Sequence, residues 1–248
     1  MDLSWSRLPS YLLVPRAVQS VPAGVSWYDW TKRVIDVSVA VLIVVLFLPL
    51  WALIAFIIKL TSRGPVLFKN VVVGQHGKPF VYYKFRTMFY NCSDAEHRRF
   101  LRRFVRNGEA YREVGTEGEE SPPGANGKKI YKLIHDPRVT PFGRFLRKSS
   151  LDEIPQMINV LRGEMSLVGP RPPLWYEYEM YGEWEKQRLA VKPGITGLYQ
   201  VTARDRVPFQ EMVRIDLDYI RRRSLSLDLW IILRTAAVMA QGDGGGQG

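Results

Sequence analysis

The chain has 248 residues, and its 35 lysines and arginines exceed its 24 aspartates and glutamates by 11. This length allows one or two domains with a hydrophobic core, and the charge favours an anionic partner: nucleic acid, a lipid surface or phosphorylated substrates. Cys92 is the only cysteine, which excludes an intramolecular disulfide. The three histidines have no metal-ligand spacing, and the chain has no P-loop.

A long apolar run follows a mixed, proline-containing arm, which we place at residues 1–30. From Val37 to Ile58, every residue is apolar or small except Ser38. At about 1.5 Å per residue, a helix of this length crosses the apolar core of a bilayer. The run starts too late for an ordinary signal peptide. We therefore expect residues 31–62 to form a membrane-inserted helix.

Pro49 lies in the middle of this run, where it removes one backbone hydrogen bond. Basic residues flank both ends, with Lys32 on one side and Lys59 on the other. Because positive flanks prefer the cytoplasm, the charges do not assign the two ends to opposite faces. We expect a re-entrant helix that breaks at Pro49 and returns to the same face. A straight span with a proline kink is the alternative that the sequence leaves open.

A β-hairpin is predicted after the membrane run. Residues 66–73 and 79–87 are rich in β-branched and aromatic side chains, and the turn-forming segment Gly74–Lys78 separates them. Side chains alternate between the two faces of a strand, so Lys84 and Arg86 are expected on one face of the second strand.

The rest of the chain predicts helices, turns and one compact body at residues 63–240. The pattern favours a basic amphipathic helix, a loop, two further helices and a flexible tail, at 94–106, 107–129, 209–222, 227–240 and 241–248. We therefore predict an α+β, membrane-associated (monotopic) protein. It should combine the proline-broken helix and a small antiparallel hairpin with several amphipathic and short helices.

Two adjacent carboxylates, Asp152 and Glu153, stand at the start of another predicted helix. Pro155 fits only in the first turn of a helix, so the helix should begin near Leu151 or Asp152. Negative charge is stabilised at a helix start, where we expect the carboxylate to be ionised and exposed. Taken alone, such a pair is typical of helix capping.

Several longer motifs favour a catalytic role of Asp152 and Glu153 over helix capping. They are Lys32-Arg33-Val34-Ile35-Asp36, Gly64-Pro65-Val66, Lys84-Phe85-Arg86-Thr87-Met88, Asp136-Pro137-Arg138-Val139-Thr140, the Asp152-Glu153 segment, Ser166-Leu167-Val168-Gly169-Pro170-Arg171-Pro172 and Pro193-Gly194-Ile195-Thr196-Gly197-Leu198. With these motifs the chain resembles the bacterial sugar transferases, the monotopic phosphoglycosyl transferases, over roughly residues 30–240.

The resemblance implies transfer of a phospho-sugar from a UDP-sugar to polyprenyl (undecaprenyl) phosphate, with release of UMP and with Mg²⁺ as cofactor. It implies that Asp152 is the nucleophile and a Mg²⁺ ligand, and that Glu153 is its partner. It also implies a re-entrant helix that breaks at Pro49 in the bacterial inner membrane, with the catalytic domain on the cytoplasmic face.

An attacking carboxylate meets anionic substrates, so cations are needed to spread the phosphoryl charge. Guanidinium groups pair with phosphate in two-point contacts. The candidate phosphate-binding residues are Lys84, Arg86, Arg144, Arg147 and Arg171.

The chain departs from the family pattern in three places. Asn70 and Val72 stand where relatives usually carry glutamine and arginine, and Leu48 precedes Pro49 where relatives often have serine. The sequence therefore leaves open any role of that arginine in this chain. It also leaves open which group satisfies the carbonyl that the proline frees.

Two other functions remain as alternatives. One is a membrane-anchored, non-enzymatic protein that binds nucleic acid or anionic lipid, although we expect no nucleic-acid partner because no such module is recognised. The other is a glycosyltransferase that uses Asp216-Leu217-Asp218 as a metal motif, but this triplet lies in an apolar-periodic helix, which favours a structural role. An oligomer is compatible with the sequence, which does not identify the sugar.

Overall fold

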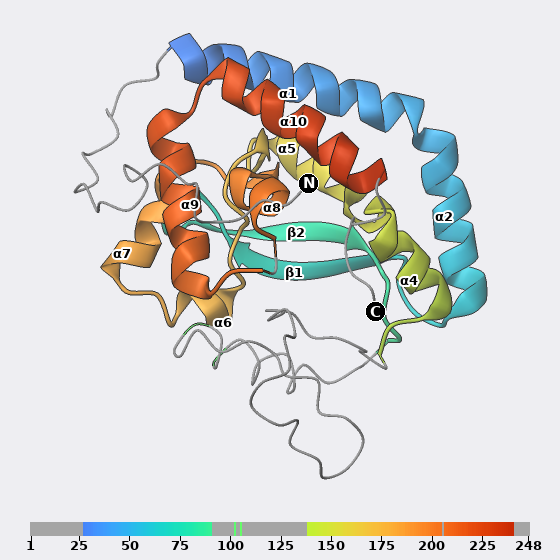
Figure 1. Cartoon of the computed structure of the whole chain (residues 1–248). Helices are drawn as coiled ribbons and strands as arrows, with labels where there is room; N and C mark the ends of the chain where they lie inside the picture. The colour runs from blue at the N-terminus through green and yellow to red at the C-terminus, as the bar shows by residue number, and fades with distance from the viewer. Residues whose placement is uncertain (1–26, 91–101, 103–104, 106–137, 205, 241–248) are drawn as a thin grey trace.

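The computed structural model describes residues 27–90, 102, 105, 138–204 and 206–240 (Figure 1). The predicted basic helix, loop and tail at 94–106, 107–129 and 241–248 lie outside these residues, apart from positions 102 and 105, as does the arm up to residue 26. Helices predominate and the sheets are small, so the predicted α+β class is confirmed.

The apolar run forms two helices that meet at a sharp bend. Helix α1 (Trp27–Leu46) begins before the predicted residue 31, and α2 (Leu48–Thr61) leaves it at an angle of 61°. Pro49 lies in the first turn of α2, where the missing N–H has no helical partner in any case. Among the described residues, no single helix is long and apolar enough to cross a membrane, but this bent pair passes that test together.

The predicted hairpin is confirmed. Strands β1 (Leu67–Val73) and β2 (Pro79–Phe85) pair antiparallel, with Asn70 opposite Tyr82 and Val73 opposite Pro79. The turn contains a short 3₁₀ segment, η3 (Gln75–Gly77). One further backbone hydrogen bond lies just outside the two strands, where Arg86 N–H donates to the Val66 carbonyl at 2.9 Å.

A second sheet was not predicted. Strands β3 (Ser166–Val168) and β4 (Gly194–Thr196) run parallel and belong to segments that sequence patterns mark as turns. The strands approach so closely that a Cβ on Gly194 would collide with the backbone nitrogen of Gly169. Glycine at both positions is what allows this pairing.

The remaining elements lie above the hairpin and at its two ends in the view of Figure 1. They are α4 (Pro141–Lys148), η4 (Leu151–Gln156), α5 (Met157–Arg162), α6 (Trp175–Tyr178), α7 (Glu183–Lys186), η5 (Gln187–Ala190), α8 (Leu198–Thr202), α9 (Phe209–Arg222) and α10 (Leu225–Ala240). Helices α1 and α10 run side by side over one face, and α2 and α4 close one end of the molecule (Figure 1). The bounds of α9 match its prediction, and α10 begins two residues earlier than predicted.

The first bent helix is fastened to the body by polar contacts near its start. Lys32 Nζ lies 2.7 Å from Asp228 Oδ2 in α10, and Arg33 donates to the Val160 and Leu161 carbonyls at the end of α5. Asp36 accepts from Leu167 N–H at 3.2 Å. These bonds fix the direction in which α1 leaves the body.

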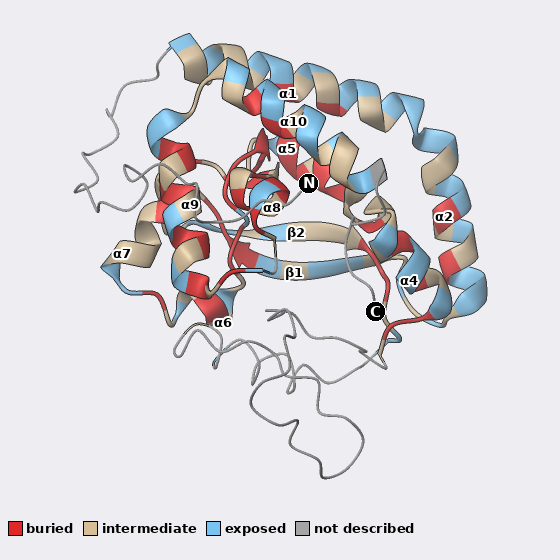
Figure 2. Cartoon of the chain, viewed as in Figure 1, coloured by how far each residue is buried: buried red, intermediate tan, exposed pale blue. Residues whose placement is uncertain are grey.

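Beyond Asp36, the helices α1 and α2 expose many apolar side chains. Helix α2 buries only Ile54 and Ile58, which pack with Phe85 and Leu146 in a small core cluster. The exposed apolar side chains on both sides of the bend include Leu42, Val45, Leu46, Leu48, Leu53, Phe56 and Leu60. Figure 2 shows this exposure along the outer side of α1 and α2. The apolar run is therefore not a helix buried on all sides within the described body.

Candidate active site

Asp152 and Glu153 lie in the 3₁₀ segment η4, directly after a chain reversal. Ser150 has φ 56°, a left-handed conformation that turns the chain sharply between α4 and η4. The prediction of an exposed carboxylate is wrong for Asp152, whose residue is only 6% exposed. The reason is tertiary: β2 packs against η4, and Leu151 joins the cluster of Phe85 and Leu146.

Asn159 in α5 fixes η4 against the hairpin. Its amide group donates to the Val81 carbonyl at 2.7 Å and accepts from Tyr83 N–H at 3.3 Å. Asn159 is fully buried, so these bonds form away from water. The register between α5 and β2 is thereby set, and with it the side chains that β2 presents to η4.

Lys84 is the side chain from β2 that meets both carboxylates. Its Nζ lies 2.6 Å from Glu153 Oε1 and 3.8 Å from Asp152 Oδ2. The ammonium also lies 5.4 Å from the centre of the Tyr82 ring. The fold therefore brings Lys84, a predicted phosphate-binding residue, to both carboxylates.

The two carboxylates have different pKa values because their surroundings differ. Burial raises the pKa of Asp152 to about 6, against the opposing attraction of Lys84. Burial also acts on Glu153, but the Lys84 ammonium, with Arg171 and Arg204, holds its pKa below the usual range. Asp152 is thus the carboxyl with the raised pKa, and Glu153 is the one with the lowered pKa. Paired carboxylates with separated pKa values are typical of catalytic sites.

The predicted cations occupy different positions around this pair. Arg147 donates from Nε to Thr87 Oγ1 at 2.9 Å, and its charge lowers the pKa of Asp152. The charge of Arg171 acts on Glu153 in the same direction. Arg86 is buried and donates to the Ser62 carbonyl and hydroxyl at 2.8 and 2.7 Å, so it lies at the end of α2. Arg144 is exposed on α4.

Arg204 is a residue that sequence reasoning missed. It follows α8, and its charge helps to lower the pKa of Glu153. A single arginine after a short helix has no periodic pattern, so only the fold brings it to the site.

The departures from the family pattern have local explanations. Asn70 accepts from Val71 N–H at 2.8 Å through its side-chain oxygen. Val72 is 1% exposed and forms a bridge with Leu174. Valine therefore fits an apolar position in this chain, where an arginine would have to bury its charge.

The donor set fits Mg²⁺ only in part. Among the residues that the structure describes, no group of three or more His, Cys, Asp or Glu side chains could hold a metal. Asp152 and Glu153 offer two carboxylates, which suits Mg²⁺ when substrate phosphates and waters supply the remaining ligands. The described residues thus offer two adjacent carboxylates for Mg²⁺ and no complete set of protein ligands.

The structure confirms that Asp216-Leu217-Asp218 has a structural role. Asp216 is buried and binds Arg188 in an ion pair of 2.7 Å, and Asp218 pairs with Arg222 on the surface at 3.0 Å. The two carboxylates therefore do not converge on one site.

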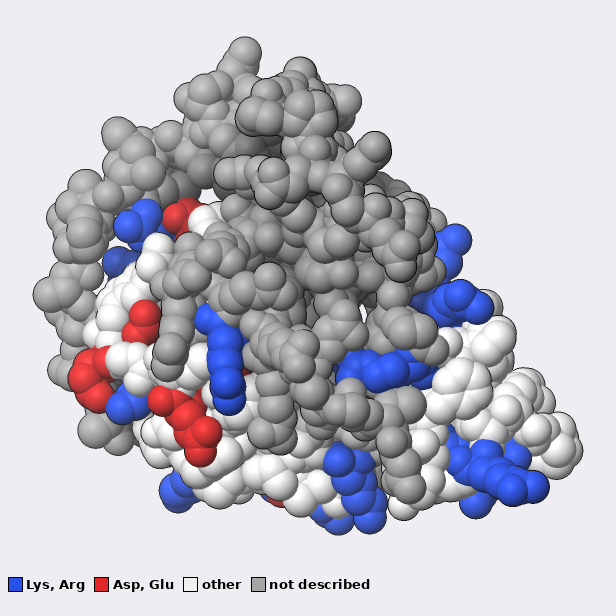
Figure 3. All heavy atoms as spheres, turned by 90° about the horizontal axis from the view of Figure 1, so that it is seen from below, with Lys and Arg blue, Asp and Glu red and all other residues white. Residues whose placement is uncertain are grey.

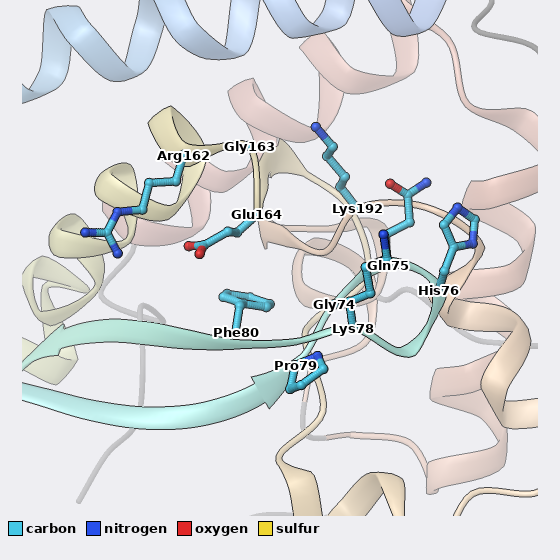
Figure 4. Close-up of a pocket in the computed structure, with 10 residues that line it drawn as sticks. All are labelled: Gly74, Gln75, His76, Lys78, Pro79, Phe80, Arg162, Gly163, Glu164 and Lys192. Carbon is cyan, nitrogen blue, oxygen red and sulfur yellow. The ribbon is translucent and has the colours of Figure 1, made fainter.

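A cavity of about 350 Å³ lies at the turn of the hairpin (Figure 4), and neither Asp152 nor Glu153 lines it. Its lining comprises Gly74, Gln75, His76, Lys78, Pro79, Phe80, Arg162, Gly163, Glu164 and Lys192. In Figure 4, Arg162 points away from the cavity and Lys192 extends toward α1, so these cations do not converge. On the face seen in Figure 3, the visible lysines and arginines lie at several separate places rather than in one patch.

Known proteins resemble this chain over most of its length. The family model described as bacterial sugar transferase matches residues 27–242. The chain is 38% identical over 214 residues to the undecaprenyl-phosphate galactose phosphotransferase of Salmonella typhimurium, covering 86% of this chain and 41% of the relative. It is 37% identical over 206 residues to the exopolysaccharide production protein ExoY of Sinorhizobium fredii, covering 83% of each.

A third relative is named for a specific reaction. The chain is 40% identical over 215 residues to the UDP-glucose:undecaprenyl-phosphate glucose-1-phosphate transferase of Caulobacter vibrioides, covering 84% of this chain and 68% of the relative. The chain spans about two fifths of the Salmonella relative, whereas it covers most of the ExoY protein. With a family model that matches from α1 to α10, the chain belongs to the bacterial sugar transferase family.

Proposed function

We propose that the protein transfers a sugar-1-phosphate from a UDP-sugar to polyprenyl phosphate, giving polyprenyl-diphosphate-sugar and UMP. This reaction would be the first membrane step in the assembly of an exopolysaccharide, capsule or other glycan. The observation that supports it most is the buried Asp152 with a pKa of about 6, beside Lys84 and Glu153, in a chain of this family. The name of the Caulobacter relative describes the same type of transfer.

In the first step, an oxygen of the Asp152 carboxylate attacks the β-phosphorus of the UDP-sugar. A bond forms between that oxygen and phosphorus, and the bond between the β-phosphorus and the bridging oxygen breaks, so UMP leaves with its electron pair. In the second step, a phosphate oxygen of the lipid attacks the same phosphorus and the Asp152 carboxylate leaves. A carboxylate is a good leaving group, which suits a covalent intermediate.

The surrounding cations would oppose the repulsion between a carboxylate and two anionic substrates. Lys84 lies against both acidic side chains, and Arg147 and Arg171 add positive charge near Asp152 and Glu153 respectively. We assign these three residues, with Arg86 and Arg144, to phosphate binding. Mg²⁺ bound by Asp152, with Glu153 beside it, would supply further charge neutralisation at the phosphoryl oxygens.

We further propose that the bent pair α1–α2 is re-entrant in the bacterial inner membrane and that the body faces the cytoplasm. The exposed apolar side chains around the bend support insertion, since an uncovered surface of this kind is unfavourable in water. The basic residues Lys32 and Lys59 at the two ends support a common cytoplasmic side.

Release of UMP from a panel of UDP-sugars, in membranes that contain polyprenyl phosphate, tests this proposal. The wild type should release UMP and Asp152→Asn should not, whereas Asp218→Asn should retain activity because Asp218 pairs with Arg222 on the surface. Radiolabelled donor should leave label on Asp152 when no lipid acceptor is present. Label on another residue would overturn the assignment, and an absence of UMP release with every donor would favour a non-enzymatic binding protein.

A further inference from the structure

The segment Pro170-Arg171-Pro172-Pro173 has an unusual shortage of backbone donors. Three of its four residues are prolines, which have no N–H. The segment therefore cannot hold itself in place through a regular pattern of its own hydrogen bonds. Its carbonyl groups must be held by donors from other parts of the chain.

The fold supplies those donors from three distant places. Gly194 N–H donates to the Pro170 carbonyl at 2.9 Å, and Val73 N–H donates to the Pro173 carbonyl at 3.0 Å. Between them, the Arg188 side chain donates from Nη2 to the Arg171 carbonyl at 3.3 Å. Two backbone donors thus fix the ends of the segment, and one side chain holds Arg171, whose charge acts on Glu153.

Arg188 is itself held rigidly. It is 2% exposed, and Asp216 in α9 accepts from its Nε at 2.8 Å and lies 2.7 Å from its Nη2. The Tyr181 hydroxyl accepts from Nη1 at 2.7 Å and donates to Glu177 at 2.8 Å. A guanidinium group with partners on all three nitrogens has one orientation, so it fixes the carbonyl that it binds.

We infer that Arg188 is a positioning residue, which acts through the Arg171 carbonyl to aim the Arg171 side chain at the phosphates of the nucleotide-sugar donor. The inference rests on the proposed function. Arg171 already contributes positive charge at Glu153, and a guanidinium group binds phosphate well only when its two donors are correctly aligned. Arg188 therefore determines donor binding although its own side chain is buried among Asp216, Tyr181 and the Arg171 backbone.

The test uses Arg188→Lys in the full chain. Lysine retains the positive charge beside Asp216 but lacks the planar fork that reaches both Asp216 and the Arg171 carbonyl. The KM for the UDP-sugar and the Kd for UDP should each rise about tenfold, the effect of losing one well-aligned hydrogen bond to a charged group. The KM for polyprenyl phosphate should stay unchanged.

Two control variants separate positioning from general destabilisation. Arg222→Lys alters the exposed ion pair between Arg222 and Asp218 in α9, the helix that also carries Asp216, and should change neither KM. Val213→Ala removes buried volume from α9 and should lower the melting temperature, with the ratio of the two KM values unchanged.

A double-mutant cycle with Arg171→Met decides the inference. If Arg188 acts through Arg171, then Arg188→Lys should not raise the Kd for UDP further in the Arg171→Met background. Additive effects, equal changes in the two KM values, or an unchanged Kd for UDP would each overturn it. Because the Kd for UDP is measured without turnover, the cycle still tests Arg188 if the wild type transfers no sugar and the proposed function fails.

Discussion

Asp152→Asn should stabilise the fold while it abolishes activity. Asp152 is 6% exposed, and burial raises its pKa from 3.8 to about 6. A carboxyl whose pKa is higher in the folded than in the unfolded protein stabilises the fold when the pH is below its unfolded pKa. This stabilisation is lost as the pH rises from the unfolded pKa to the folded pKa. The ionised Asp152 is therefore a source of instability at neutral pH, whereas the amide has no charge to desolvate.

The size of this effect on the free energy of unfolding follows from the pKa of Asp152 in the unfolded protein, 3.8, and in the folded protein, about 6. They differ by about 2.2, which at about 1.36 kcal/mol per pKa unit is roughly 3 kcal/mol at pH 8. For a chain of this size, 1 kcal/mol corresponds to about 2–4 °C in Tm, so Asp152→Asn should melt about 6–12 °C higher than the wild type. The difference in Tm between Asp152→Asn and the wild type should develop between about pH 4 and pH 6 and stay constant at higher pH.

Thermal melting in detergent at pH 4 and pH 8 measures this effect. Glu153→Gln is the matched control, because Lys84 holds the pKa of Glu153 below its usual range. A carboxyl whose pKa is lower in the folded than in the unfolded protein stabilises the fold when the pH is above its unfolded pKa. This stabilisation is lost as the pH falls toward the folded pKa. Glu153→Gln should therefore melt below the wild type at pH 8. An Asp152→Asn variant that melts below the wild type at pH 8, or that shows the same difference at both pH values, would refute the reasoning.

Three further predictions concern the bent pair α1–α2, helix α4 and the proposed metal. After replacement of Cys92, single cysteines placed before Lys32 and after Lys59 should both react with an impermeant label from the cytoplasm; labelling from opposite sides would show a spanning helix. Gly143→Ala should destabilise the fold by about 1–3 kcal/mol, because its Cβ would collide with the Thr87 carbonyl, and an unchanged melting temperature would contradict that packing. Chelation should abolish UMP release and added Mg²⁺ should restore it, whereas activity that persists in chelator would exclude a metal requirement.

The local patterns of the sequence predicted the elements that depend on neighbouring residues. Alternation and the Gly74–Lys78 turn predicted the hairpin, and the observed strands differ only at their outer ends. Pro49 predicted the break in the apolar run, which the structure places between α1 and α2. A proline removes its hydrogen bond whatever surrounds it, so a single position was enough.

The motif of two carboxylates was also visible in the sequence, but its chemistry was not. Helix-start reasoning predicted that Asp152 would be ionised and exposed, because the first turn of a helix stabilises negative charge. Its burial comes from β2, which lies far away in sequence and packs over η4. Only that contact raises its pKa and brings Lys84 to both acidic side chains.

The sequence by itself determined the composition, the apolar run with its break, the hairpin and the family motifs, because each rests on a composition or spacing that can be read along the chain. The tertiary structure alone decided the pairing of β3 with β4, the placement of Arg204 near Glu153 and the support of Arg171 by Arg188. These contacts join segments that have no common periodicity, so their partners are set only when the hydrophobic core brings them together.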